Sequence, residues 1–350
     1  MGLKMGKKVF IAGGGTGGHF YPALAVAQYL KNKGYDIFYF GTDRGIEAQK
    51  DFIDNKYLFN IEGVRGKSLL KKASSSYKLM KTALKIRDFI KKEKPEFAIC
   101  FGGYTSIPLG LASKISGIPL YIHEQNSIPS YSNILLSKFA KKVFVTFDFS
   151  KRYFPKEKVI RTGLPIRESL KQRLNLTKEK AREMLGIPVD KKVVLIFGGS
   201  QGAKKLNAKA IELAEENPDT IFINIQGKNP IHSNLKNLIT YSYYEDMGIL
   251  YKASDFVISR AGSGTVNELM AFGKYSIFVP YPYAASNHQF YNVKWLEEKG
   301  LSKVIEEKDI NIINSLIKDI LKMDFGLLKS QIKKFAILDA EKRIYEEIVS

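Results

Sequence analysis

Residues 9–20 read VFIAGGGTGGHF, four apolar residues followed by a loop of five glycines, one threonine and one histidine. The apolar run 9–12 predicts a buried strand. The apolar pattern of residues 22–33 predicts a helix, because Pro22 stands near its start and Gly34 just past its end. A strand, a glycine loop and a helix in this order predict the first unit of a Rossmann-like α/β domain.

The same order of elements returns later in the chain. Residues 193–197 predict a second buried strand, followed by a glycine turn at 198–202 and a helix from about Leu206. A Gly-Leu-Pro sequence at 163–165 suits a linker between the two halves. The length of 350 residues also favours two domains. We therefore predict domains at 1–163 and 164–335.

Further predicted strands and helices alternate in both halves, which is typical of parallel βαβ units. The strands are predicted at 36–40, 97–100, 119–123, 143–146, 221–225, 256–259 and 276–280, and the helices after the turn 102–104 to about 114 and near 265–272, 289–299, 310–322 and 336–348.

Composition limits the class of protein. The single cysteine, Cys100, lies in an apolar run, so we expect a small buried side chain and no internal disulfide, which fits a reducing compartment. No segment has about 18 consecutive apolar residues, and the short basic start lacks the apolar core of a signal peptide. We expect a cytoplasmic protein. Its net charge of +20 points to nucleic acid, an anionic membrane or anionic substrates, unless a general lysine bias explains it.

The first glycine loop permits two interpretations. Gly13, Gly15 and Gly18 fit the G-x-G-x-x-G dinucleotide fingerprint, and Asp43 follows the second strand, so an NAD(P)-dependent oxidoreductase is one hypothesis. His19 favours the second interpretation, in which the loop carries a catalytic base. A helix N-terminus favours the neutral form of the imidazole, and this form can accept a proton. Its plainer alternative is a helix cap or a packing residue.

The second half carries its own candidate anion site. Residues 260–268 read RAGSGTVNE, and their small residues precede a predicted helix whose free N–H groups suit a diphosphate. Glu268 is expected in the first turn of that helix. It either accepts hydrogen bonds from ribose hydroxyls or compensates the positive end of the helix.

Seven motifs together resemble one family. They are GGGTGGH (13–19), FGGYTS (101–106), HEQN (123–126), GLPIR (163–167), GGSQGA (198–203), RAGSGTVNE (260–268) and NHQ (287–289). Their types and order resemble the family 28 glycosyltransferases that transfer N-acetylglucosamine from UDP-GlcNAc to lipid I, forming lipid II. The resemblance implies a GT-B fold, in which two doubly wound, parallel-sheet Rossmann-like α/β domains face a cleft. It also implies that a C-terminal helix, about 336–350, packs back on the first domain.

The resemblance implies the following roles. In the first domain, the donor and acceptor are approached by Thr16, Gly17, Gly18 and Asn126. The diphosphate is contacted by Arg167 and Ser200, and the uracil by Tyr244. The diphosphate and ribose are held by Ser263, Gly264, Thr265, Val266, Asn267 and Glu268, and the sugar hydroxyls are reached by Gln289. The chain departs from the usual family residues at Leu164, Tyr244 and Gly264, and its segment 281–286 is one residue longer than in some members.

The expected reaction inverts the anomeric carbon. We predict that His19 is the general base, and that Glu124 and Asn126 orient it or the acceptor. The leaving diphosphate is expected to be stabilised by helix N-termini, Arg167 and Ser200. UDP-GlcNAc is a substrate, and no cofactor or tightly bound metal is expected, because no Asp-x-Asp or His/Cys cluster stands out.

Residues 65–94 hold eleven basic and two acidic residues, a net charge of +9, interleaved with apolar ones. From about Ser75 they predict a basic amphipathic helix. Its apolar face either packs only on the sheet or leaves a basic rim for anionic lipid on the cytoplasmic face of the bacterial membrane, where the enzyme would bind peripherally and meet lipid I. Nucleic-acid binding is not expected, because no recognition motif accompanies the charge.

Two further alternatives remain. One is a glycosyltransferase of the same fold with another acceptor, such as a diacylglycerol or a polyketide. The other is a binding protein that has lost catalysis, which the presence of His19, Glu268 and Gln289 disfavours.

Overall fold

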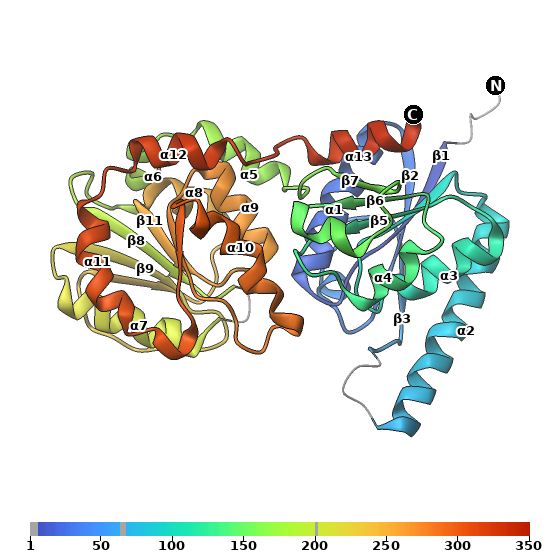
Figure 1. The fold of residues 1–350 in the computed structure, drawn as a ribbon, viewed down its shortest axis with the longest axis horizontal. Coiled ribbons are helices and arrows are strands. Elements are labelled where there is room, and N and C mark those ends of the chain that lie inside the picture. Colours follow the sequence, from blue (N-terminus) through green and yellow to red (C-terminus); the bar gives the residue numbers. More distant parts are fainter. Residues whose placement is uncertain (1–5, 64–67, 200–201) are drawn as a thin grey trace. The chain divides into compact units, whose positions relative to one another are not determined.

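The computed structural model describes residues 6–63, 68–199 and 202–350. The chain forms two compact domains, each a parallel sheet flanked by helices (Figure 1). Domain 1 comprises Met1–Arg167 and Asp339–Ser350, and domain 2 comprises Glu168–Leu338. In both sheets the paired strands of the described residues are parallel, which predicts burial on both faces.

Domain 1 has a seven-stranded sheet in the order β3-β2-β1-β4-β5-β6-β7. Its strands are β1 (Lys7–Ala12), β2 (Tyr35–Thr42), β3 (Asn55–Phe59), β4 (Phe97–Cys100), β5 (Leu120–Glu124), β6 (Lys142–Val145) and β7 (Val159–Arg161), and its helices are α1 (Gly17–Asn32), α2 (Leu69–Glu93), α3 (Ser106–Ser116), α4 (Tyr131–Ser137) and α13 (Ala340–Val349). The strand order reverses between β1 and β4. Such a switch point is where open α/β sheets bind ligands.

Alternate residues of β1 feed two cores. Val9 and Ile11 pack with α1 and α13 on one face of the sheet, and Phe10 and Ala12 pack with α2, α3 and α4 on the other. The C-terminal helix α13 is therefore part of domain 1. Its residue Glu347 accepts from Lys142 Nζ at 2.9 Å.

Domain 2 has a six-stranded sheet in the order β10-β9-β8-β11-β12-β13, with the switch point between β8 and β11. Its strands are β8 (Lys192–Phe197), β9 (Thr220–Ile225), β10 (Leu238–Tyr241), β11 (Phe256–Ser259), β12 (Ser276–Phe278) and β13 (Ser302–Val304), and its helices are α5 (Glu168–Gln172), α6 (Lys178–Leu185), α7 (Lys204–Glu216), α8 (Met247–Ala253), α9 (Ser263–Phe272), α10 (His288–Glu298), α11 (Ile312–Lys322) and α12 (Phe325–Lys333).

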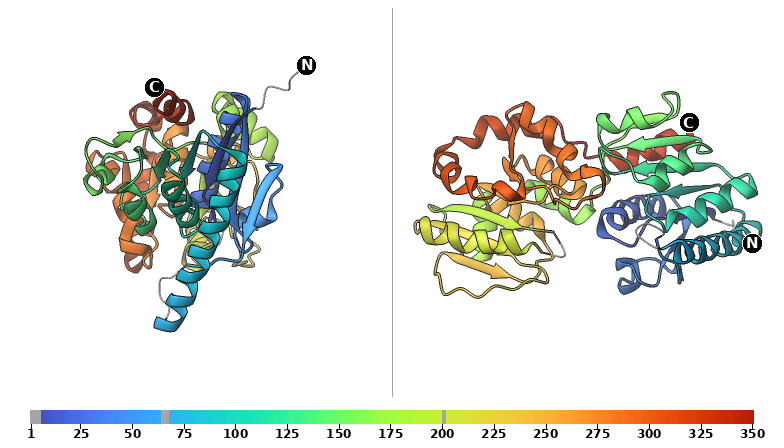
Figure 2. Two further views of the ribbon diagram at one scale, coloured as in Figure 1. Left: turned by 90° about the vertical axis from the view of Figure 1, so that its right-hand side faces the viewer. Right: turned by 60° about the horizontal axis from the view of Figure 1, so that its bottom comes forward.

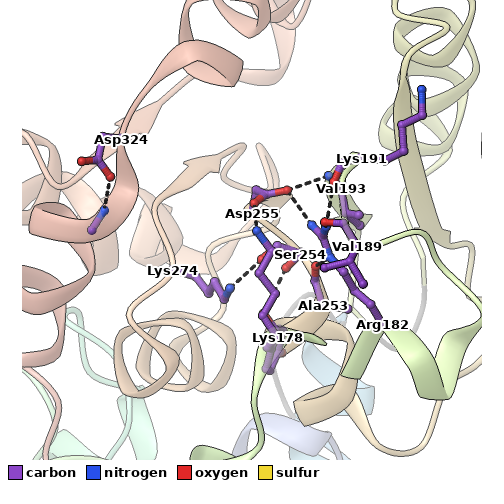
Figure 3. A network of polar contacts seen from close by, with 12 residues as sticks. Lys178, Arg182, Val189, Lys191, Val193, Ala253, Ser254, Asp255, Lys274 and Asp324 are labelled. Atoms are coloured by element: carbon purple, nitrogen blue, oxygen red, sulfur yellow. Dashed lines mark hydrogen bonds and ion pairs between the residues drawn. The ribbon is translucent and has the colours of Figure 1, made fainter. Parts of the chain in front are cut away.

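A buried charge network ties α6 to the amino ends of β8 and β11 (Figure 3). Arg182 is fully buried and donates to Asp255 at 2.9 Å and to the carbonyl of Ala253 at 3.0 Å. Asp255 also accepts from the Val193 N–H at 2.7 Å. Burial alone would raise the pKa of Asp255, but the hydrogen bond from Lys178 and the other contacts outweigh it and hold that pKa below its usual value.

Several predicted element boundaries were wrong. Helix α1 begins at Gly17, so Pro22 lies inside the helix rather than at its start. Helix α9 begins at Ser263, two residues before the predicted start. The C-terminal helix begins at Ala340, because residues 336–339 form no helical turn.

Cys100 is fully buried, as expected, and burial raises the pKa of its thiol to about 12. Across the described ranges, no helix is both long and apolar enough to cross a membrane.

Candidate functional site

The first glycine loop follows β1 and is organised by Glu47, a residue that the sequence did not single out. Both carboxylate oxygens of the buried Glu47 accept from the Gly15 N–H, at 2.9 and 3.0 Å, and one accepts from the Thr42 N–H at 2.9 Å. A side chain at Gly14 or Gly45 would overlap this carboxylate. The N–H of Gly15, which a dinucleotide phosphate would need, is therefore taken by the protein's own anion.

His19 lies in the first turn of α1, with its ring held at Nδ1. Nδ1 is 2.9 Å from the carbonyl oxygen of Phe101 and 3.0 Å from Gln125 Oε1. A carbonyl oxygen only accepts hydrogen bonds, so Nδ1 carries the proton and donates. In the neutral ring Nε2 then has the free lone pair, which is the form that a general base requires.

The second glycine loop, residues 101–106 after β4, packs directly on the His19 ring. Gly102 and Gly103 have φ angles of 84° and 73°, in the left-handed region that favours glycine. A Cβ at Gly103 would lie 3.2 Å from His19 Cδ2, and one at Gly102 would lie 3.3 Å from His19 Cε1. The loop also contacts the first one, because Thr105 Oγ1 accepts from the Gly14 N–H at 3.1 Å. The two loops thus position the imidazole together.

The HEQN motif ends β5, but Glu124 makes no hydrogen bond to His19 in the structure. Its buried carboxylate accepts from the N–H groups of Asn126 and Ser130, at 2.9 and 3.0 Å, and from Asn133 Nδ2 at 2.8 Å. Burial raises the pKa of Glu124 despite these hydrogen bonds. The residue of this motif that contacts His19 is Gln125.

The other predicted residues of domain 1 lie around the start of α1, just after β5 or in the segment after β7. Thr16 is the N-cap of α1, and its side chain and Gly18 are exposed. The guanidinium of Arg167 stacks over the Tyr21 ring at 4.5 Å, and among the described residues its buried Nε has no hydrogen-bond partner. Asn126 is half-buried.

Domain 2 contains a cavity of about 550 Å³ at the carboxyl ends of its strands. It is lined by Gly198, Gly202, Ala203, Lys204, Lys205, Asn229, Arg260, Tyr281, Gln289 and Glu307. Ser200 was predicted to contact the diphosphate, but it lies outside the described residues. The cavity includes Gly198 and Gly202 from the glycine turn after β8 and has basic residues on its wall, which suits an anionic ligand.

Arg260 and Glu307 form a largely buried ion pair in this wall. Arg260 also donates to the carbonyls of Val279 and Pro280 at 3.1 and 3.2 Å, which fixes the loop after β12. Burial would raise the pKa of Glu307, but Arg260 and Lys205 outweigh it and hold that pKa below its usual value. Glu307 was not among the predicted site residues, because nothing in its local sequence marks it as a partner of Arg260.

The expected position of Glu268 within α9 was wrong. Because α9 begins at Ser263, Glu268 lies in its second turn and does not compensate the helix end. Its carboxylate accepts from Tyr251 Oη at 2.8 Å and is half-buried.

The remaining residues of α9 differ in what they expose. The first N–H groups of the helix belong to Ser263, Gly264 and Thr265, and a Cβ at Gly264 would meet open space. Val266 is fully buried, and Asn267 Nδ2 donates to the Ser263 carbonyl at 2.9 Å, so both side chains serve the fold.

Gln289 lines the cavity and is held through its carbonyl oxygen. Oε1 accepts from the N–H groups of Ala261 and Tyr281 at 3.2 and 2.9 Å, which leaves the amide nitrogen as a donor. The preceding residues Ser286 and Asn287 both have φ of 53°, a strained conformation that is common at binding sites. Tyr244 lies after β10, half-buried, with its ring 5.0 Å from that of Tyr241.

The comparisons with known proteins identify the class. The family model for the glycosyltransferase family 28 N-terminal domain matches residues 9–145, and that for the family 28 C-terminal domain matches residues 193–347. The chain belongs to glycosyltransferase family 28. The oxidoreductase hypothesis is therefore wrong, in keeping with the engaged N–H of Gly15.

The chain is also similar over its full length to particular enzymes named UDP-N-acetylglucosamine--N-acetylmuramyl-(pentapeptide) pyrophosphoryl-undecaprenol N-acetylglucosamine transferase. It is 53% identical to the one from Sulfurihydrogenibium sp. (strain YO3AOP1), over 98% of both chains. It is 42% identical to that of Aquifex aeolicus (strain VF5), over 97% of this chain and 99% of that one. A crystal structure of Acinetobacter baumannii MurG aligns with a TM-score of 0.75 and 28% identity, covering 98% of this chain and 99% of that one.

Within the described parts of the chain, no group of three or more His, Cys, Asp or Glu side chains is arranged to hold a metal ion.

Proposed function

We propose that this chain transfers N-acetylglucosamine from UDP-GlcNAc to the muramyl sugar of lipid I, forming lipid II for peptidoglycan. The observation that carries the proposal is the identity of 53% over 98% of both chains to a relative named for this transfer. A different acceptor for the same fold is disfavoured, because the similarity extends through domain 1, on which the HEQN motif and both first-domain glycine loops lie.

His19 is the general base of the proposed reaction. Nε2 takes the proton of the acceptor hydroxyl as its oxygen bonds to the anomeric carbon. The bond from that carbon to UDP breaks, and its electron pair leaves with the diphosphate, which inverts the configuration. The hydrogen bonds at Nδ1 support this role, because they leave the lone pair on Nε2.

The donor is proposed to bind in domain 2. The diphosphate would bind to the free N–H groups at the start of α9 and to the basic wall of the cavity. Glu268 would accept hydrogen bonds from the ribose. The amide nitrogen of Gln289 would donate to the sugar. Arg167, with its buried and unpaired Nε, would contact the leaving diphosphate. Ser200 and Tyr244 keep their predicted diphosphate and uracil roles as part of the proposal.

The test is GlcNAc transfer to a lipid I analogue. His19→Ala is expected to lower kcat by about 10²–10⁴-fold, because it removes the base. Glu268→Ala is expected to raise KM for UDP-GlcNAc by about 10- to 100-fold, since a charged hydrogen bond is lost. The control is His232→Ala, which removes an exposed histidine of domain 2. Wild-type kcat in His19→Ala would show that the base assignment is wrong.

We also propose that α2 docks on the anionic cytoplasmic face of the membrane, where lipid I is found. Helix α2 packs along α3, and its amino-terminal turns extend past the neighbouring helices (Figure 2). Leu70, Tyr77, Met80 and Leu84 form an exposed apolar stripe on it, with exposed fractions of 85%, 68%, 48% and 41%. The opposite face is buried in the domain.

Basic residues flank this stripe. At 100° per residue, Lys81 lies about 40° from Tyr77 on one side of the stripe, with Lys85 about 40° further round the helix, and Arg87 lies about 20° from Met80 on the other side. An apolar stripe with a basic margin is the pattern of helices that lie in a membrane interface. This arrangement supports a peripheral position for an enzyme with a lipid-linked acceptor.

Binding to vesicles with and without anionic lipid tests the docking. Each basic residue near an anionic surface contributes about 1 kcal/mol, so Lys81→Gln with Lys85→Gln should weaken binding by about 30-fold. Lys180→Gln with Lys191→Gln in domain 2 is the charge-matched control. Equal binding of the wild type to neutral and anionic vesicles contradicts the proposal.

A further inference from the structure

Three side chains, one in the first turn of α1 and two at the carboxyl end of β5, form a continuous series of hydrogen bonds that ends on the main chain. His19 Nδ1 is 3.0 Å from Gln125 Oε1, Gln125 Nε2 is 3.2 Å from His123 Nδ1, and His123 Nε2 is 2.9 Å from the carbonyl oxygen of Gly163. Gln125 and His123 are fully buried. The proposed function uses His19 alone, so the other two side chains have no role in it.

The direction of each hydrogen bond follows from its carbonyl partners. Gln125 Nε2 is also 3.0 Å from the main-chain oxygen of His123, which only accepts, so the amide nitrogen lies at that end and Oε1 faces His19. The carbonyl of Gly163 likewise requires the proton of His123 on Nε2. His123 Nδ1 is therefore an acceptor for the amide of Gln125.

His123 stays neutral in this arrangement. Burial lowers the pKa of its imidazole to about 4, although the hydrogen bond to Gly163 acts in the opposite direction. Its ring is also stacked on Phe101, with centroids 5.5 Å apart, which limits rotation. A neutral, fixed His123 offers one acceptor nitrogen, and this holds the amide of Gln125 in one of its two orientations.

We propose that Gln125 and His123 are positioning residues that, together with the main-chain carbonyl of Phe101, keep the proton of His19 on Nδ1, so that Nε2 is the nitrogen that accepts the proton of the acceptor hydroxyl. This inference rests on the proposed transferase reaction. In the opposite tautomer Nδ1 would face two oxygens without a proton, and Nε2 would carry one and be unable to accept another.

The same hydrogen bonds also stabilise His19 after it has accepted the proton. Once Nε2 is protonated, the Nδ1–H group still donates to Gln125 Oε1 and to the carbonyl of Phe101, so both oxygens stabilise the imidazolium. Both partners are neutral carbonyls. They stabilise the charge, and neither takes up the proton.

The tautomers are measured directly in protein labelled with ¹⁵N in histidine. The chain has four histidines, His19, His123, His232 and His288, and single His→Gln variants assign their signals. We expect the neutral rings to carry the proton on Nδ1 at His19 and on Nε2 at His123. A His19 ring protonated on Nε2 overturns the proposal, whatever the activity of the enzyme.

The second test is Gln125→Leu, which keeps the approximate size of the side chain and removes all three of its hydrogen bonds, to His19, to the His123 ring and to the His123 main chain. We expect kcat to fall by about 10- to 100-fold with little change in KM for UDP-GlcNAc, because the carbonyl of Phe101 alone then favours the proton on Nδ1 and part of the His19 population takes the other tautomer. The ¹⁵N signals of His19 should show that mixture. Gln125→Glu, which restores an acceptor for Nδ1–H, should recover part of kcat and move the acid limb of the pH–rate profile to higher pH.

The matched control is Asn237→Leu in domain 2. Asn237 Nδ2 donates to the carbonyls of Ala214, Asn217 and Thr220, so this variant also loses a partly buried amide, but away from His19. If Gln125→Leu and Asn237→Leu lower kcat equally, or if the His19 tautomer does not change in Gln125→Leu, the positioning role is wrong. Failure of the wild type to transfer GlcNAc would instead refute the proposed function and leave the tautomer result readable.

Discussion

Gly103 illustrates how single residues set the geometry around His19. Its φ of 73° and the 3.2 Å that would separate a Cβ at this position from His19 Cδ2 are two separate constraints against a side chain. Gly117, the C-cap of α3, has a similar φ of 71° but open space around its Cβ position. Substitutions at the two glycines therefore distinguish the effect of backbone strain from the effect of contact with the imidazole.

We expect Gly103→Ala to lose about 1 kcal/mol of stability from the left-handed backbone and, in addition, to lower kcat about 10- to 100-fold, because the new methyl group displaces the imidazole. Gly117→Ala should show the loss of stability only. Urea denaturation and transfer kinetics of the two variants check this. Equal kcat values would show that the second loop does not position His19.

The sequence pointed to His19 but not to its neighbours. Gln125 lies in a motif that was singled out for Glu124 and Asn126, yet the side chain of Gln125 is the one that reaches His19. Glu47 has no motif around it at all. Both act through contacts across the fold, at separations of 106 and 32 residues, which local pattern does not encode.

At the level of elements, the strands that sequence analysis missed are the edges of both sheets. The central strands were found because two buried faces produce continuous apolar runs. The missed ones are β3, β7, β10 and β13, which are half-buried or mixed in their exposure. An edge strand has no pattern of its own that separates it from a loop, because its neighbour in the sheet supplies its pairing.

Helix α6 is anchored by the buried pair of Arg182 and Asp255. Arg182→Met should destabilise domain 2 by about 1.5–3 kcal/mol, because it removes one of the two cationic partners of the buried Asp255 carboxylate and leaves only Lys178 and the Val193 N–H on it. Lys180→Met on the exposed side of the same helix should change stability by less than about 0.5 kcal/mol. Urea unfolding of both variants, followed in domain 2, measures the difference, and equal losses would contradict the role of the pair.

For the whole molecule, pH sensitivity of folding is expected to come partly from His123 in domain 1. Its pKa is about 4 in the fold and about 6.5 in the unfolded chain, so between these values the unfolded state binds more protons. Stability contributed by the neutral imidazole is present above pH 6.5 and lost as pH falls towards 4, by about 3 kcal/mol in total.

The measurement is the free energy of unfolding from pH 7 to pH 4. His123→Gln should show a shallower decline than the wild type by about 3 kcal/mol over this range, whereas His232→Gln, at an exposed position, should follow the wild type. Identical slopes for the wild type and His123→Gln would contradict the assignment of a neutral, buried His123.

The order of apolar runs, glycine turns and helical patterns was enough to predict two Rossmann-like domains, and the seven motifs were enough to indicate the family. These features are local, because a buried parallel strand and the glycine loop after it are each written in a few consecutive residues. The start of α1 at Gly17, the edge strands and the buried partners of His19 were not predictable in this way. They depend on which strands lie side by side, since the carboxyl ends of β1, β4 and β5 bring the loops around residues 19, 102 and 125 together only after the sheet has formed.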